Sequence, residues 1–266
     1  MCVKKIPDPE IPPAKFRLES QSLRVIPPEG IPPVMNPYDE QAVELALRLK
    51  DKHGSEVTVL TIDNETSPSV LKHALAMGAE AGIALVDPAF EGSDSFATAY
   101  ILSRAVKKIG EYDLVLCGRQ AADWDEGLVG TILAEKLGAP LVTLAYEVDL
   151  EDGECHVKRA LLDGYQVFAL PFPSVLTVSN EVGQPRLPSG WGIIAASQKE
   201  IPAWNAADIG ADPARIGAGA SRRTLAKLYI PQRDRRCELI EGETASEAAA
   251  ELAETLVKKG IIQGRH

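Results

Sequence analysis

The fold is decided by the stretch Asp113-Leu-Val-Leu-Cys-Gly-Arg-Gln-Ala-Ala-Asp-Trp-Asp-Glu-Gly-Leu-Val-Gly130, which joins a strand to a helix through a polar loop. The apolar residues 114–117 predict a short buried strand that ends at Gly118. From about Asp125, apolar residues recur at helical spacing as far as Leu137. In a parallel sheet, such a joint opens on the crevice at the carboxyl ends of the strands, where free backbone N–H groups suit a phosphate.

The loop in this stretch leaves two interpretations open. Gly127 and Gly130 lie where a side chain would obstruct the approach of a phosphate. The carboxylates of Asp123, Asp125 and Glu126 would repel a phosphate unless they point away, cap the helix or bond to ribose hydroxyls. Most joints of this kind bind nothing, and the Gly-Lys-Ser/Thr of a P-loop is absent from the sequence. Spacing alone therefore does not settle whether a phosphate binds here.

The sequence before this stretch predicts alternating strands and helices. Strands are expected at 2–6, 57–62 and 83–86, and helices at 37–49, 69–77 and 96–109. The clearest helix start is Asn36-Pro37, with Asn36 as the cap. The proline-rich residues 7–33 are expected to leave the core and to contain a short hairpin. The expected fold class is therefore α/β, a parallel sheet flanked by helices.

After Pro140 the pattern changes to successive strand-like runs. They are residues 141–146, 156–162, 166–170 and 174–178, separated by turn residues. We expect antiparallel strands here, joined by tight turns. A rigid loop at 184–191 then presents Trp191, which is either a packing anchor or a recognition element. A short helix is expected near 193–199.

Residues 201–236 show little periodicity and predict an extended arm, which cannot bury a core of its own. An amphipathic helix is expected at 244–258. The arm and helix either fold back onto their own sheet or embrace another subunit, and the length of the arm favours the second. We therefore expect a nucleotide-binding α/β domain at 1–200 and, at 201–266, an arm and helix that contact a partner subunit.

Composition restricts the functions that are open to the chain. The 266 residues carry a formal net charge of −10, which argues against nucleic-acid binding. No apolar stretch has the length of a membrane span, and a cytoplasmic protein is expected. The four cysteines are far apart, so neither a metal site nor a disulfide framework is indicated. The residues present no nucleophile and base at catalytic spacing.

Several motifs together resemble the beta subunit of electron transfer flavoproteins. They are Cys2-Val-Lys-Lys-Ile-Pro-Asp8, Met35-Asn36-Pro37, Ala74-Leu-Ala-Met-Gly-Ala79, Gly118-Arg-Gln-Ala-Ala-Asp-Trp-Asp125 and Gln184-Pro-Arg186, and the match is collinear over nearly the whole chain. The resemblance implies an adenine nucleotide alpha hydrolase-like fold and an electron carrier rather than an enzyme. It implies a heterodimer with an alpha subunit that holds the redox-active FAD. It also implies a second nucleotide in this chain, either AMP or a second FAD.

The same resemblance implies which residues form the sites. The nucleotide is expected against Cys2, Val3, Asn36, Ile62, Asp63, Gly118, Arg119, Gln120, Ala121, Asp123, Asp125, Glu126, Gly127, Leu128, Val129 and Gly130. Pro185, Arg186, Gly190 and Trp191 are expected to recognise a redox partner, which would be acyl-CoA dehydrogenase-like or linked to quinone or ferredoxin. No catalytic residue and no metal ligand is implied.

Departures from the family pattern bear on the choice of nucleotide. Members that bind AMP resemble Asn-Gln-Thr-Gly where this chain has Gly127-Leu-Val-Gly130, so the side-chain donors for a phosphate monoester are missing. A diphosphate bridge suits such a site better, which favours FAD and leaves electron bifurcation from NADH open. Trp124 stands where members that bind FAD resemble a small residue, and its ring would either fill the flavin's space or stack on the flavin.

Other departures bear on the partners. Gln166 replaces a glutamate of the domain interface, and Ala195 and Gln198 replace lysines of the recognition segment, which weakens the expectation of a dehydrogenase partner. A second class of function is an adenine-nucleotide hydrolase or adenylyl transferase of related fold. In that case Asp123, Asp125 and Glu126 would hold Mg²⁺ against a phosphate.

Overall fold

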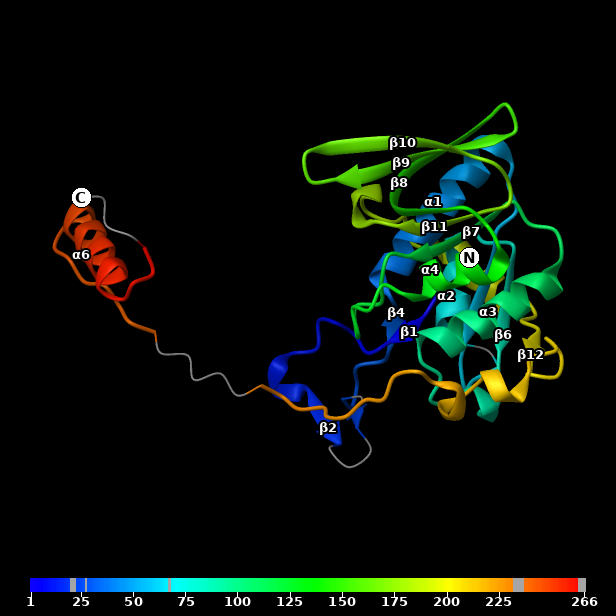
Figure 1. The fold of residues 1–266 in the computed structure, drawn as a ribbon, viewed down its shortest axis with the longest axis horizontal. Coiled ribbons are helices and arrows are strands. Elements are labelled where there is room, and N and C mark those ends of the chain that lie inside the picture. Colours follow the sequence, from blue (N-terminus) through cyan, green and yellow to red (C-terminus); the bar gives the residue numbers. More distant parts are fainter. Residues whose placement is uncertain (20–22, 27, 67, 232–236, 263–266) are drawn as a thin grey trace. The chain divides into compact units, whose positions relative to one another are not determined.

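The computed structural model describes residues 1–19, 23–26, 28–66, 68–231 and 237–262 (Figure 1). By its internal contacts the chain forms two compact units, Met1–Leu228 and Tyr229–His266. The expected domain boundary at residue 200 therefore lies inside the first unit. Residues 232–236 and 263–266 of the expected arm and helix lie outside the described part of the chain.

The first unit is built on a central sheet with the N-terminal segment in its middle. The strands, in spatial order, are β12 (Ala203–Trp204), β6 (Ala81–Leu85), β5 (Thr58–Ile62), then the N-terminal segment, then β7 (Leu114–Gly118), β11 (Ser174–Val178), β8 (Leu141–Glu151), β9 (Glu154–Leu161) and β10 (Gly164–Leu170). Cys2 forms parallel bridges to Leu60 on one side and Cys117 on the other. All pairings from β12 to β8 are parallel, and β9 and β10 are added antiparallel. The predicted fold class is thus confirmed.

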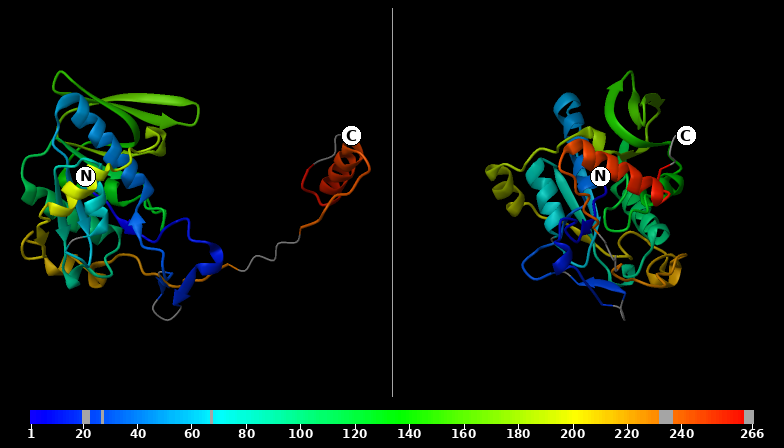
Figure 2. Two further views of the ribbon diagram at one scale, coloured as in Figure 1. Left: turned by 180° about the vertical axis from the view of Figure 1, so that it is seen from behind. Right: turned by 90° about the vertical axis from the view of Figure 1, so that its left-hand side faces the viewer.

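Helices cover both faces of this sheet (Figures 1 and 2). They are α1 (Pro37–His53), α2 (Ser69–Met77), α3 (Ser95–Ile109), α4 (Val129–Leu137) and α5 (Gly190–Gln198). Successive strand residues face opposite sides of a sheet. Accordingly, Val59 packs in one core with residues of α1 and α2, and Leu60 in a second core with residues of α3 and α4. The sheet is therefore buried between two helical layers, and its strand ends remain for a site.

The antiparallel strand predicted at 174–178 was wrong. This segment is β11, which lies between β7 and β8 and runs parallel to both. All five of its residues are buried. An uninterrupted apolar strand of this kind is typical of a parallel sheet covered on both faces. The insertion of β11 places its last residue, Val178, beside Gly118 at the end of β7.

Smaller elements flank the core. They are β1 (Lys5–Ile6) with β4 (Val34–Met35), the predicted hairpin β2 (Arg17–Glu19) with β3 (Arg24–Ile26), and 3₁₀ turns at Pro13–Lys15, Pro88–Phe90, Asn180–Val182, Pro213–Arg215 and Ala218–Ala220. Of the strand predicted at 2–6, Cys2 bridges the central sheet in parallel, and Lys5–Ile6 form β1, which pairs antiparallel with β4.

Residues 201–228 pack on the first unit, although their sequence has little periodicity. β12 pairs with β6. Farther along, the backbone amides of Arg222 and Arg223 donate to the Asp94 carboxylate at 2.6 and 3.2 Å. These contacts are made largely by the backbone, so no apolar pattern in the sequence marks them. They carry the chain to the start of α3.

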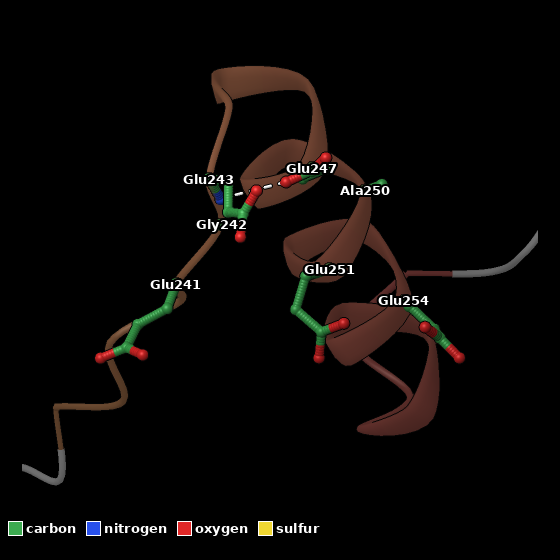
Figure 3. A pocket seen from close by; sticks show the side chains of 7 residues that line it. All are labelled: Glu241, Gly242, Glu243, Glu247, Ala250, Glu251 and Glu254. Carbon is green, nitrogen blue, oxygen red and sulfur yellow. Dashed lines mark hydrogen bonds between the residues drawn. The ribbon is translucent and has the colours of Figure 1, made fainter.

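The second unit contains the predicted amphipathic helix, α6 (Ala245–Lys258). The Thr244 hydroxyl caps it by accepting from the Glu247 amide at 3.2 Å. Figure 3 shows a hollow between this helix and the segment before it. Five of its seven lining residues are glutamates: Glu241, Glu243, Glu247, Glu251 and Glu254. This part of the unit is therefore strongly acidic.

Candidate functional site: a crevice at the carboxyl edge of the sheet

The candidate site lies where β5, the N-terminal segment and β7 end together. The Cys2 amide donates to the Leu116 carbonyl at 3.0 Å, and the Val3 amide donates to Leu60 at 2.9 Å. The N-terminal segment thereby joins the two halves of the sheet. Ile62 and Asp63 end β5 on one side, and Gly118 ends β7 on the other. The structure therefore brings the predicted residues of three separate segments to one edge.

Asn36 is the N-cap residue of α1, and its side chain binds the loop after β7. Its amide Nδ2 donates to the Gln120 carbonyl at 2.8 Å, and its Oδ1 accepts from the Ala122 amide at 3.1 Å. The residue is 1% exposed, and its side chain makes no cap hydrogen bond to the first backbone amides of α1. The predicted helix start at Asn36-Pro37, with Asn36 as the cap residue, is confirmed. Its side chain fixes the loop that carries most of the candidate site.

Asp39, in the first turn of α1, is a residue of the crevice that the sequence analysis missed. Its carboxylate accepts from the Lys4 amide at 2.8 Å and from the Gly118 amide at 2.9 Å. Burial raises the pKa of this carboxyl to about 7, although the hydrogen bonds from Asn36, Lys4 and Gly118 oppose that shift. An acidic residue in a first helical turn is common, because it suits the helix dipole. The sequence therefore gave no sign of this role.

The acidic residues of the loop are each held by a different partner. Asp123 pairs with the Lys4 ammonium at 2.6 Å, and Asp125 accepts from the Gln120 amide at 2.8 Å. Glu126 accepts from the Ser95 hydroxyl and pairs with the Arg223 guanidinium at 2.6 Å. The helix α4 begins at Val129, later than the expected start near Asp125, and no described side chain caps it. The loop carboxylates are thus neutralised or hydrogen-bonded away from the helix start.

The loop glycines are required by the packing of the protein itself. A Cβ on Gly130 would lie 2.6 Å from the Thr177 side chain. Gly127 has a φ of +63°, and a Cβ there would lie 3.3 Å from the Arg119 carbonyl oxygen. The obstacles to side chains at both positions are therefore neighbouring protein atoms. The structure does not require the sequence-based explanation, in which these glycines clear space for a phosphate.

The remaining loop residues hold the loop in shape. The Arg119 guanidinium lies 5.0 Å from the centre of the Tyr38 ring and donates to Asn180 Oδ1 at 3.1 Å. The Ala121 carbonyl accepts from the amides of Trp124 and Asp125. Leu128 and Val129, both partly buried, lead into α4. The Trp124 residue is 49% exposed, so it lies at the loop surface.

Two groups at this edge are free to bind a ligand. The Asp63 side chain is 1% exposed, and its Oδ1 accepts from the Lys5 ammonium at 2.8 Å. Its Oδ2 is buried and has no hydrogen-bond partner among the described residues, which is costly unless a ligand donates to it. The first N–H groups of α4 likewise receive no side-chain cap from the described part of the chain. An orphaned acceptor together with free helix amides fits the hydroxyls or amino group and the phosphates of an adenine nucleotide.

The predicted recognition residues lie on a second surface, around the start of α5. Arg186 is engaged within the chain, because it donates to Glu44 and Asp51 on α1, each at 2.8 Å. Pro185 is partly buried, and Gly190 is the first residue of α5. Trp191 is 82% exposed. Of these four residues, Trp191 thus presents the largest apolar surface.

The described residues contain no group of three or more His, Cys, Asp or Glu side chains that could hold a metal ion. The three loop carboxylates point to different partners, so the arrangement does not support a magnesium site for a hydrolase or transferase. No described helix is long and apolar enough to cross a membrane.

A parallel sheet covered by helices on both faces, with polar groups gathered at its carboxyl edge, is an architecture typical of nucleotide-binding α/β proteins. Residues 25–209 match the family model described as "Electron transfer flavoprotein domain". The chain belongs to the electron transfer flavoprotein family, and it is an electron-carrier subunit of the beta type, as the sequence motifs predicted.

Relatives match over almost their whole lengths. The chain is 36% identical to caffeyl-CoA reductase-Etf complex subunit CarD of Acetobacterium woodii, with 98% of each chain covered. It is also 36% identical to the electron transfer flavoprotein subunit beta of Clostridium acetobutylicum, again over 98% of each chain. It is 33% identical to protein FixA of Azotobacter vinelandii, over 99% of this chain and 94% of that protein.

Proposed function

We propose that this subunit binds FAD in the crevice at the carboxyl edge of its sheet and passes electrons as one half of a heterodimer with an electron transfer flavoprotein alpha subunit. The observation that carries the proposal is the buried, unsatisfied Asp63 Oδ2 after β5, together with a start of α4 after β7 that no described side chain caps. In a family of electron carriers, a site with these two features calls for a bound nucleotide. When bound, the flavin supplies the one- and two-electron chemistry, and the protein supplies position and electrostatics.

Each group of the crevice has a defined task in this proposal. Asp63 accepts from a ribose hydroxyl or from the adenine amino group. The first backbone amides of α4 donate to phosphate oxygens, where the positive end of the helix dipole adds to the attraction. Lys4 and Arg223 compensate the charges of Asp123 and Glu126, which would otherwise repel the phosphates. Asn36 keeps the loop in the conformation that exposes these amides.

The choice of FAD over AMP rests on the donors at the start of α4. Gly127-Leu-Val-Gly130 offers backbone N–H groups and no side-chain donor. A phosphate monoester carries more charge than a diester and needs more donors to offset its desolvation. The diphosphate bridge of FAD therefore suits this helix start better. Trp124, at the loop surface, is then available to stack on the flavin ring, because the ring prefers an aromatic or apolar face.

The partners in this proposal bind at separate surfaces. Leu161, Leu162, Tyr165 and Val167 form an exposed apolar surface on β9 and β10, which suits burial against the alpha subunit. The helix α6, which exposes Leu252 and Val257, adds a second contact with that subunit. The loop before α5 presents Trp191 to the redox partner. Similarity to a subunit of a caffeyl-CoA reductase-Etf complex supports a reductase-type partner. Such a partner is compatible with electron bifurcation.

Mass analysis of the nucleotides released from the purified heterodimer tests the proposal. Two FAD molecules per heterodimer are expected after denaturation. Release of one FAD and one AMP would replace the FAD assignment by the AMP alternative. Release of no nucleotide beyond the flavin of the alpha subunit would contradict the crevice as a binding site. The variant Asp63→Asn should lower occupancy of the beta site, because its amide nitrogen cannot accept a hydrogen bond.

A further inference from the structure

The carboxylate of Asp39 joins the two backbone segments that border the crevice. One oxygen, Oδ2, accepts from the Lys4 amide at 2.8 Å, and the other, Oδ1, accepts from the Gly118 amide at 2.9 Å. Lys4 belongs to the N-terminal segment, which runs between β5 and β7, and Gly118 is the last residue of β7. One side chain from α1 therefore sets the separation between these two backbone segments.

The Asp39 carboxylate and the Gly118 backbone lie so close together that only a glycine fits at position 118. A Cβ on Gly118 would lie 2.4 Å from Asp39 Oδ1 and 2.7 Å from the Tyr38 carbonyl carbon. Asp39 itself is only 6% exposed. Because both oxygens receive N–H donors, the ionised carboxylate satisfies both amides, whereas a protonated carboxyl would turn its O–H toward one of them. The geometry thus selects the charged form of a buried group.

We propose that Asp39 is a positioning residue, whose ionised carboxylate aligns the N-terminal segment and the end of β7 so that the crevice can bind its nucleotide. This inference rests on the proposed function, because the crevice is taken to hold FAD. Asp39 touches the nucleotide at no point in this proposal. It acts through the amides of Lys4 and of Gly118, the residue that leads into the loop that Asn36 also holds.

The charged and titratable neighbours of Asp39 determine how the contact responds to pH. The N-terminal segment contributes the Met1 ammonium, the Cys2 thiol and the Lys4 ammonium, and β7 contributes the Cys117 thiol. On α1, the adjacent Glu40 faces away, because its carboxylate binds His73 Nε2 at 2.8 Å. Burial raises the pKa of Asp39 to about 7. Nucleotide affinity should therefore fall as the pH drops through about 7, since protonation removes one of the two acceptors.

The folding free energy should show the opposite dependence. Between the ordinary pKa of an aspartate and about 7, the folded chain binds the Asp39 proton and the unfolded chain does not. The contribution of this group to stability therefore decreases as the pH rises through that window. A purely structural role for Asp39 would produce this stability profile alone, without the loss of nucleotide affinity at low pH.

The experiment uses the heterodimer with the alpha flavin retained and the beta site emptied, titrated with FAD between pH 6 and 8.5. Wild-type affinity is expected to decrease toward pH 6. Asp39→Asn is expected to bind FAD about tenfold more weakly at pH 8, because the amide group presents a donor to one of the two N–H groups, and to show no pH dependence. Glu40→Gln, the same change at the next residue, should behave as wild type.

Amide hydrogen exchange of the nucleotide-free complex separates this inference from the proposed function. Protection of the Lys4 and Gly118 amides should fall in Asp39→Asn and persist in Glu40→Gln. Equal protection in all three proteins, or equal pH profiles of FAD affinity in wild type and Asp39→Asn, would overturn the positioning role. Failure of wild type to bind FAD at any pH would count against the proposed function instead. If Asp39→Asn does not fold, the wild-type pH profile decides, and a flat profile overturns the inference.

Discussion

The crevice at the sheet edge and the surface around α5 differ in how much of their bonding is internal. In the crevice, the side chains of Asn36 and Asp39 are buried and bind backbone of the same chain. Around α5, Trp191, Ile193 and Ile194 are 82%, 57% and 53% exposed. The crevice is therefore shaped before any ligand arrives, whereas the α5 surface leaves apolar area for another molecule to cover. Substitutions should damage folding in the first region and association in the second.

The largest expected effect is that of Gly118→Ala in the crevice. The new methyl group would overlap Asp39 Oδ1 and the backbone at Tyr38, which cannot move without shifting α1. We expect the free energy of unfolding to fall by about 3 kcal/mol, a value typical of severe overpacking. Urea denaturation measures it. The control is Gly164→Ala at the start of β10, where a Cβ would meet no described atom within 4 Å. Equal urea midpoints for the two variants would remove the steric argument.

The next effect in size is that of Asn36→Ala. It leaves the partly buried Gln120 carbonyl and Ala122 amide without their partner. We expect a loss of about 2 kcal/mol in the free energy of unfolding, together with weaker nucleotide binding. Thermal unfolding and FAD titration measure the two effects. Asn180→Ala removes an exposed asparagine that accepts from Arg119, and it should cost far less. A crevice that tolerates Asn36→Ala as well as Asn180→Ala is not shaped by this side chain.

A smaller effect is expected from Arg186→Ala. Arg186 connects the two regions, because it lies in the loop before α5 and donates to Glu44 on α1. Burial raises the pKa of Glu44, but hydrogen bonds from Arg186 and Arg48 outweigh it, so the pKa lies below its ordinary value. The pair therefore stabilises the fold above that ordinary pKa, and the contribution is lost as the pH falls through the lower pKa of the folded state. We expect Arg186→Ala to cost about 1.5 kcal/mol at pH 7, and the difference from wild type to narrow below about pH 4.

Urea midpoints measured from pH 3 to pH 8 follow this difference. The control is Asp51→Ala, which removes only the outer partner of Arg186, a side chain that is 58% exposed. Its effect should stay within about 0.5 kcal/mol, as is usual for an exposed ion pair. A difference between wild type and Arg186→Ala that does not change with pH would show that the Glu44 contact carries none of the effect.

The smallest effect on folding is expected from Trp191→Ala. The side chain is largely exposed, so the free energy of unfolding should change by less than about 0.5 kcal/mol. The rate of electron transfer with the redox partner should instead fall about tenfold, because an exposed tryptophan is a typical anchor in an interface. Stopped-flow reduction of the flavin measures this rate. Trp191→Phe should retain most of it. An unchanged rate in Trp191→Ala would place partner recognition elsewhere.

The sequence predicted the core of the fold because local patterns encode it. The alternation of strands and helices up to α4 follows from apolar periodicity and from helix stops such as Gly78 and Gly110. The error at β11 came from reading adjacent strands as hairpins. Its unbroken run Ser174-Val-Leu-Thr-Val178, apolar apart from one serine and one threonine, is typical of a buried parallel strand, and that signal was present in the sequence.

The candidate site was harder to predict because its contacts join distant residues. The local sequence around Asn36 indicates a helix cap, yet its side-chain amide donates to the Gln120 carbonyl, 84 residues farther along the chain. Asp39 reads as an ordinary acid in a first helical turn. Arg223 reads as part of an extended arm, yet it pairs with Glu126 across the fold. In each case the residue type is common at such a position, and only the packing of several segments gives it a second role.

The helix α1 fixes one dimension of the molecule. Asp39 holds the crevice, and Glu44, five residues farther along, holds the loop that presents Trp191. A helix advances about 1.5 Å per residue, so the two anchoring points lie roughly 8 Å apart along its axis. Because both anchoring residues belong to one helix, the distance between the crevice and the loop before α5 is fixed along that axis. In the proposed arrangement, with the flavin in the crevice and the redox partner at Trp191, a bend introduced into α1 would change the distance between them, and so the rate of electron transfer, without weakening either binding site.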